Sequence, residues 1–241
     1  MRRHLKRRQH CSRRRCDLLD VACGTGLVTS AAAQRGVRVV GVDFSPNMVA
    51  AASELYPTLQ FREADAEDLP FADGAFDAVV IKFGVHHFPF PVQALREAHR
   101  VIRPGGRLAL TVWASPQEYA LQKITLGALR DAGVAGAVLP TPPGGAVNEM
   151  STCIDLLRAS RFATTASQTQ KLDAALWLES EQHLIDMLVH GTVRMSTVIR
   201  SQPPEMVDAI GVEIRKAAAA YRDGDGLCIP ITARLAVGTR T

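Results

Sequence analysis

The chain has 241 residues, 47% of them hydrophobic, which is enough for one α/β domain with a sizeable insertion or for two small domains. No run of about 18 apolar residues occurs, so the sequence argues against a membrane span. The formal net charge of +4 is unevenly placed, because residues 1–16 hold eight Lys or Arg and no acid, while the rest holds 20 basic and 24 acidic residues.

Residues 1–16 form a basic tail that allows three interpretations. The tail could bind nucleic acid or another anionic surface through phosphate contacts. It could instead be a targeting peptide, or a disordered start of the chain. It has neither the apolar core of a secretory signal nor aromatic residues for base stacking. We therefore favour a disordered tail over one that binds nucleic acid.

The cysteines point to a reducing setting. There are five, an odd number, and none forms a Cys-x-x-Cys pair or a Cys/His cluster at zinc spacing. We expect a cytoplasmic protein without a structural metal.

The stretch 18–43 predicts a strand, a glycine turn, a helix and a second strand that ends in an acid. Gly24 and Gly26 follow an apolar run, and Asp43 closes the next one. Glycines let a backbone approach a ligand closely, and a helix that follows them offers free N–H groups. An acid at the tip of the second strand can accept the two hydroxyls of a ribose. The unit therefore predicts a nucleotide-like ligand.

Apolar runs and turn signals along the chain predict an α/β fold with a mostly parallel, seven-stranded sheet. The predicted strands are 17–22, 37–42, 59–63, 76–81, 107–113, 162–172 and 227–237. The predicted helices are 27–35, 46–55, 91–102, 118–132, 151–160, 179–199 and 204–221. We expect a tail (1–16), a cofactor-binding core (17–114) and a C-terminal part (115–241) whose helical insertions, 116–148 and 173–225, form a substrate cap.

Five blocks keep the order and spacing of one family. They are LDVACGTG at 19–26, GVDFS at 41–45, ADAEDLPF at 64–71, FD at 76–77 and RVIRPGG at 100–106. The chain resembles the class I S-adenosylmethionine-dependent methyltransferases of small molecules, such as those of ubiquinone and menaquinone biosynthesis. The resemblance covers residues 17–114 and implies a Rossmann-like, doubly wound sheet with an antiparallel last strand. It also implies S-adenosyl-L-methionine as cofactor.

A dinucleotide is the rival ligand for the same unit. Its fingerprint has a third glycine, where this chain has Thr29. Asp43 suits both ligands, whereas Asp65-Ala66 after the third strand resembles the adenine site of the methyltransferases.

The resemblance implies a role for each matching residue. Asp20 would hold the methionine amino group, Gly24 and Gly26 would pass under the methionine and ribose, and Asp43 would accept the ribose hydroxyls. The remaining cofactor contacts would come from Asp65 and Ala66 at the adenine edge, Phe44 against its ring, Lys82 near the sulfonium, and Ala22.

His86 and His87 are the candidates for a general base, since they follow the fourth strand at the edge where ligands bind. Tyr119, His183 and His190 lie in the predicted insertions and could face a substrate. Residues 81–84 lack the Asn/Asp-Pro-Pro-Tyr/Phe segment of enzymes that methylate adenine or glutamine nitrogen.

These observations predict a methyltransferase that transfers a methyl group to a small-molecule acceptor by in-line displacement. Two alternatives stay open: a non-catalytic S-adenosylmethionine-binding protein of the same fold, and a nucleic-acid methyltransferase guided by the tail. One departure bears on them, because the family has a helical segment over the cofactor before the first strand, and here only the Arg-rich residues precede it.

Overall fold

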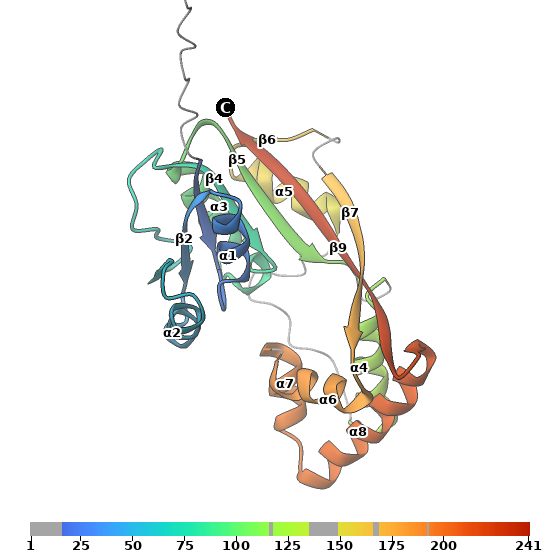
Figure 1. Ribbon diagram of the computed structural model, residues 1–241. Helices are drawn as coiled ribbons and strands as arrows, with labels where there is room; N and C mark the ends of the chain where they lie inside the picture. Colours follow the sequence, from blue (N-terminus) through green and yellow to red (C-terminus); the bar gives the residue numbers. More distant parts are fainter. Residues whose placement is uncertain (1–15, 116–117, 135–148, 166–168, 192) are drawn as a thin grey trace, which may run out of the picture.

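A computed structural model describes residues 16–115, 118–134, 149–165, 169–191 and 193–241. The basic tail up to residue 15 and the Pro/Gly-rich loop at 140–145 lie outside these ranges. Within them the chain forms one mixed sheet with helices around it (Figure 1). The strands are β1 (Asp17–Val21), β2 (Arg38–Asp43), β3 (Gln60–Glu63), β4 (Phe76–Lys82), β5 (Ile102–Trp113), β6 (Phe162–Ala163), β7 (Thr169–Leu178), β8 (Arg222–Asp223) and β9 (Gly226–Arg240).

The sheet has the strand order β3-β2-β1-β4-β5-β9-β6. Strands β1 to β5 are parallel, and β9 runs antiparallel to β5, β6 and β7. The order reverses between β1 and β4, so that right-handed crossovers place the helices after β1 and β2 on one face and the helix after β4 on the other. This reversal opens a crevice at the carboxyl ends of β1 and β4, where open α/β sheets bind their ligands.

The α/β class and the antiparallel last strand are confirmed, but the prediction of seven strands is wrong. There are nine among the described residues, because the predicted strand 162–172 is two strands that lie in succession along the same edge of β9. β6 pairs with Thr239 and Arg240, and β7 pairs with Leu227 to Ala236. The ninth strand, β8, is a two-residue hairpin partner of β9 across Gly224, whose φ is +58°.

The helices divide into two groups. α1 (Leu27–Gln34) and α2 (Pro46–Leu55) pack along β2 and β3, while α3 (Pro91–Val101) and α5 (Met150–Ala159) pack together near β5, β6 and β9. The cap helices are α4 (Ala120–Asp131), α6 (Glu181–His190), α7 (Val193–Arg200) and α8 (Pro204–Ala218). No helix in the described ranges is long and apolar enough to cross a bilayer.

The cap helices lie apart from α1, α2 and α3, and β7 and β9 extend from the sheet to reach them (Figure 1). They have a hydrophobic cluster of their own, which includes Leu129, Leu184 and Ile210. Leu227 and Ile229 of β9 belong to this cluster, whereas Ala236 of the same strand belongs to the cluster under the parallel sheet. β9 therefore contributes side chains to both hydrophobic clusters.

Two element boundaries differ from the sequence prediction for local reasons. The predicted helix 179–199 is two helices, α6 and α7, and α6 ends at Gly191, a residue that favours helix ends. β5 begins at Ile102 rather than 107, because Ile102 already pairs with Phe76 of β4. The Pro-Gly-Gly segment lies in a register shift, with Gly105 at φ +80°, and the pairing resumes at Arg107.

Charged residues join the strands at the amino edge of the sheet, opposite the crevice. Asp17 accepts hydrogen bonds from the guanidinium groups of Arg38 and Arg103, and Arg103 also pairs with Asp77. The Arg38 hydrogen bond, followed by that of Arg103, holds the pKa of Asp17 below its usual value although burial opposes this. These pairs stabilise the edge without contributing to the crevice.

Glycine at position 238 is a packing requirement of β9, and this gives a stability prediction. In Gly238→Ala the added methyl would stand 2.7 Å from Cβ of Phe162 and 3.2 Å from Leu157. We expect the free energy of unfolding, measured by urea denaturation, to fall by about 1–3 kcal/mol.

Gly127→Ala in α4 is the matched control. The nearest heavy atom to its new methyl is a guanidinium nitrogen of Arg130 at 3.8 Å, so helix propensity should raise stability by about 0.5–1 kcal/mol. Equal effects of the two substitutions would contradict the packing argument.

Candidate functional site

The turn between β1 and α1 brings backbone N–H groups to the crevice. Ala22, Gly24 and Gly26 all have positive φ angles, of +56°, +54° and +83°. Gly26 is the N-cap of α1, and no side chain caps the helix there. The first turn of α1 therefore offers N–H groups to a ligand. An L-residue such as Ala22 is rare in this region, and such strain concentrates at functional sites.

Glycines 26 and 41 keep this turn close to the sheet. A Cβ at either position would come within 2.7 Å of the ring of Phe61, which projects from β3. The sequence motif therefore has a packing reason as well as a conformational one.

Asp43, at the end of β2, fixes the turn through its carboxylate. One oxygen accepts the N–H of Gly24 and the other accepts the N–H of Ser45, both at 2.9 Å. Carboxylate oxygens can each accept more than one hydrogen bond, so this arrangement orients the group and leaves acceptor capacity for a ligand. Asp43 is only partly buried, which allows a ligand to reach it.

Asp20 is a buried acid beneath the turn. Its residue is 1% exposed, and the hydroxyl of the fully buried Thr29 donates to it at 2.7 Å. Burial raises the pKa of Asp20 to about 6, while the Thr29 hydrogen bonds and the positive charge of Lys82 oppose the rise. Thr29, which stands where the dinucleotide fingerprint has its third glycine, therefore holds the buried Asp20. Sequence reasoning overlooked its hydroxyl, although its position one helical turn beyond Gly26 was a usable signal.

Asp65 and Ala66 lie in the loop after β3, next to this group of residues. The N–H of Ala64 donates to the Asp43 carbonyl at 3.0 Å, which ties the start of the loop to the end of β2. Asp65 is exposed and accepts the N–H of Glu67 at 2.8 Å, whereas Ala66 is buried in the core. The structure thus brings Asp65 to the same edge as Asp20 and Asp43.

The end of β4 contributes an aromatic and basic segment. Phe83, at φ +56°, stacks on Trp113 with ring centroids 3.7 Å apart. Trp113 stacks in turn on Tyr119 at 4.9 Å, and Tyr119 leads into α4 of the cap. The ammonium of Lys82 lies 5.7 Å from the Phe83 centroid. Sequence reasoning missed Trp113, although its place at the carboxyl end of β5 was a signal.

The candidate bases are at the same edge. His86 and His87 form a 3-10 turn, Val85–His87, with their rings 4.2 Å apart. Gly84 brings this turn against β1, since a Cβ on it would be 2.6 Å from that of Ala22. Phe44 is 75% exposed beside Asp43. The other candidates separate: His183 and His190 lie exposed on α6, while Tyr119 is buried in the aromatic stack.

A family model described as a methyltransferase domain matches residues 19–110, which contain every part of this site except Tyr119 and Trp113. The match covers less than half of the chain and falls on the part that contains the parallel strands. The demethylmenaquinone methyltransferase of Beutenbergia cavernae is 48% identical to this chain over 99 residues, covering 41% of each chain. That of Chlorobaculum parvum is 40% identical over 121 residues, covering half of each.

The chain spans half or less of the length of these curated relatives. Over most of its length the chain is similar in fold to a solved protein of Bacillus halodurans described as a methyltransferase. The TM-score is 0.58 at 21% identity, and the match covers 94% of this chain and 93% of the other. At that identity the likeness shows the fold alone, including the cap.

The buried acid gives a prediction on stability and pH. The Asp20 carboxyl is protonated in both states below about pH 4, whereas above its folded pKa of about 6 the folded protein carries a buried charge. A rise of about two pKa units corresponds to roughly 3 kcal/mol of stability lost between these pH values. We expect Asp20→Asn, which retains an oxygen for the Thr29 hydroxyl, to be about 1–3 kcal/mol more stable than the wild type at pH 7.5.

The stability gain of Asp20→Asn over the wild type should vanish near pH 4, where the wild-type carboxyl is neutral. Urea denaturation of both proteins at the two pH values measures the difference. A gain that is the same at both values would show that ionisation of Asp20 is not its cause.

Proposed function

We propose that the chain is an S-adenosyl-L-methionine-dependent methyltransferase that acts on a small molecule. The observation that carries this proposal is the convergence of three acids, Asp20, Asp43 and Asp65, with an uncapped helix N-terminus at one edge of the sheet. The donor set suits the cofactor, which presents an ammonium group, two ribose hydroxyls and an adenine amino group. Each of these cofactor groups would find an acceptor of matching character.

In this proposal Asp20 faces the methionine ammonium, with Ala22, Gly24 and Gly26 forming the backbone floor. Asp43 accepts the ribose hydroxyls. At the adenine end, Asp65 accepts the amino proton, the Ala66 N–H donates to the ring, and Phe44 covers it. The cofactor supplies an activated methyl group on a sulfonium. The protein mainly orients the two reactants, which can account for roughly 7–11 kcal/mol of the barrier.

We propose the aromatic edge as the acceptor side of the site. Lys82 and Phe83 follow β4, and the stack through Trp113 and Tyr119 connects them to the cap. A planar, quinone-like acceptor would suit such a surface, as the names of the curated relatives also suggest. Residues 17–114 would then bind the cofactor and the cap in 115–241 would select the acceptor.

The two alternatives have no specific observation in their favour. A tail-guided nucleic-acid enzyme depends on residues outside the described ranges.

We propose a cytoplasmic setting for the protein. Four cysteines lie in the part of the chain that the structure describes, and all four are free thiols: Cys16, Cys23, Cys153 and Cys228. Free thiols are typical of a reducing compartment, which supports this proposal.

Cofactor binding tests the proposal through Asp43. We expect the wild type to bind S-adenosylhomocysteine in calorimetry and Asp43→Ala to bind it at least about 10–100-fold more weakly, because charge-assisted hydrogen bonds are worth about 1.5–3 kcal/mol each. Asp173→Ala on β7 is the control, because its carboxylate accepts the Thr232 hydroxyl and, within the described ranges, β7 pairs only with β9, on the side of β9 away from the parallel strands. Absence of binding by the wild type would refute the proposal.

The two histidines give a prediction on the chemical step. If the acceptor must lose a proton, a general base contributes about 10²–10⁴-fold. We expect one of His86→Gln and His87→Gln to lower kcat by such a factor on a hydroquinone acceptor, with the affinity for S-adenosylhomocysteine unchanged. Unchanged kcat in both variants would exclude a histidine base.

A further inference from the structure

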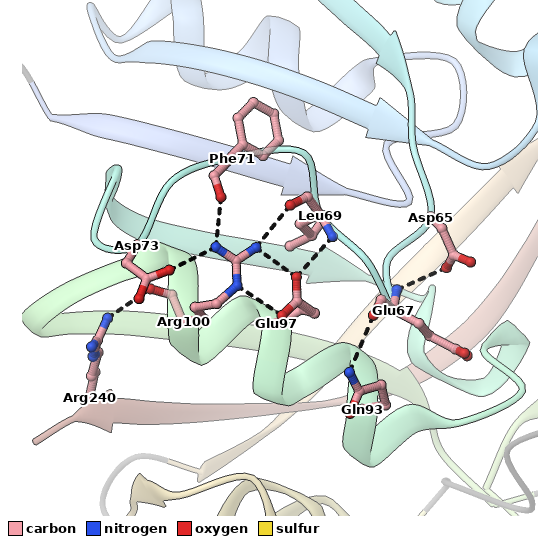
Figure 2. A network of polar contacts seen from close by, with 9 residues as sticks. All are labelled: Asp65, Glu67, Leu69, Phe71, Asp73, Gln93, Glu97, Arg100 and Arg240. Atoms are coloured by element: carbon pink, nitrogen blue, oxygen red, sulfur yellow. Dashed lines mark hydrogen bonds and ion pairs between the residues drawn. The ribbon is translucent and has the colours of Figure 1, made fainter.

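The loop that carries Asp65 and Ala66 is fastened to helix α3 by one arginine. All five N–H donors of Arg100 are engaged: Nε and Nη2 hold Glu97, Nη2 also reaches the carbonyl of Leu69, and Nη1 reaches the carbonyl of Phe71 and the carboxylate of Asp73 (Figure 2). These distances lie between 2.7 and 2.9 Å.

Glu97 completes the attachment from the same helix. Its Oε2 accepts the N–H of Leu69 at 2.9 Å, so both backbone groups of this buried residue are bound to the Glu97–Arg100 pair. The pair is partly shielded, with 14% and 31% of the two side chains exposed. The Arg100 hydrogen bonds hold the pKa of Glu97 below its usual range. The pair is therefore charged at neutral pH.

The two ends of the loop are held as well. The Glu67 carboxylate accepts the N–H of Phe90 at the start of α3, at 2.7 Å, and its carbonyl accepts from the Gln93 amide at 3.4 Å (Figure 2). At the other end Gly74 donates its N–H to the Arg100 carbonyl at 2.9 Å. The loop therefore follows α3 from residue 67 to residue 74, and Asp65 and Ala66 lie between this attachment and the end of β3.

We propose that Glu97 and Arg100 are positioning residues for recognition of adenine. Neither is placed to touch the cofactor. They fix the positions of Asp65 and Ala66 relative to the end of β3. Asp65 supplies an acceptor for the adenine amino group, and Ala66 supplies a donor for the neighbouring ring nitrogen. The inference rests on the proposed function, since it concerns how the cofactor site selects its base.

Selectivity for the base is the property that this attachment controls. Hypoxanthine presents an oxygen where adenine has its amino group and an N–H where adenine has an acceptor nitrogen. A rigid loop would bind hypoxanthine more weakly than adenine. The Asp65 acceptor would face the hypoxanthine oxygen and the Ala66 donor would face its N–H, so neither pair could form a hydrogen bond. A loosened loop can move away from both mismatches. Loosening should therefore reduce the preference for adenine, and not only the affinity.

Arg100→Lys is the test substitution. Lysine keeps the charge but has three donors in place of the planar set of five, so it cannot hold Leu69, Phe71, Asp73 and Glu97 together. Calorimetry with S-adenosylhomocysteine and S-inosylhomocysteine gives the ratio of the two Kd values. We expect the ratio to fall at least 10-fold in Arg100→Lys, and to fall in the same direction in Glu97→Gln, which serves if the first variant does not fold.

Arg103→Lys is the matched control. Arg103 is also partly buried and multiply bonded, but its partners are Asp17, Asp77 and the carbonyl of Ala75 at the opposite edge of the sheet. Its ratio should equal that of the wild type. In the Asp65→Ala background, Arg100→Lys should change the ratio less than it does in the wild type, because only the Ala66 donor is left to be positioned.

The outcomes separate the two proposals. If the wild type binds neither ligand, the proposed function fails and the inference fails with it. If the wild type binds and prefers the adenine compound, but Arg100→Lys weakens both ligands equally, the pair has a merely structural role and the inference alone is overturned.

Discussion

Asp43 is the residue on which the cofactor edge depends, because it joins three loops that are far apart in sequence. Its carboxylate holds Gly24 of the first loop and Ser45 of the second. Its backbone carbonyl holds Ala64, where the third loop begins. A single acid at a strand end thus sets the relative positions of the backbone floor, the start of α2 and the segment with Asp65. The same carboxylate is the proposed ribose acceptor, so scaffold and ligand contact coincide.

The buried Asp20 shows the opposite relation between stability and function. A carboxylate with 1% exposure destabilises the fold when it is ionised, and one threonine hydroxyl offsets only part of that effect. The strained φ of Ala22 and of Phe83 lies within the same crevice. A cationic ligand would compensate the charge of Asp20, and its binding would therefore stabilise the ionised residue. The molecule concentrates its local instability where a ligand would relieve it.

The sequence predicts the parallel half of the fold well because its determinants are local. Buried parallel strands are nearly continuous apolar runs, and glycines and end-of-strand acids mark the loops between them. The antiparallel half depends on partners. Strand β7 consists mostly of exposed residues without a regular alternation, and nothing within it indicates that β9 will pair with it for ten residues. The hydroxyl of Thr29 is an intermediate case: its position after Gly26 was a signal in the sequence, but its partner Asp20 comes beside it only once α1 folds back on β1.

Strand β9 also has a consequence for how the chain folds. Strands β1 to β5 can assemble from contacts between neighbouring segments, but β5 then presents an unpaired edge until β9 arrives from more than a hundred residues further along the chain. An open edge of this kind is a template for pairing with another molecule. β9 follows the cap helices in the chain, so this edge stays open until the residues after α8 pair with β5. Pairing of β9 with β5 therefore protects the nascent parallel sheet from aggregation, a role separate from any contact of the cap with a substrate.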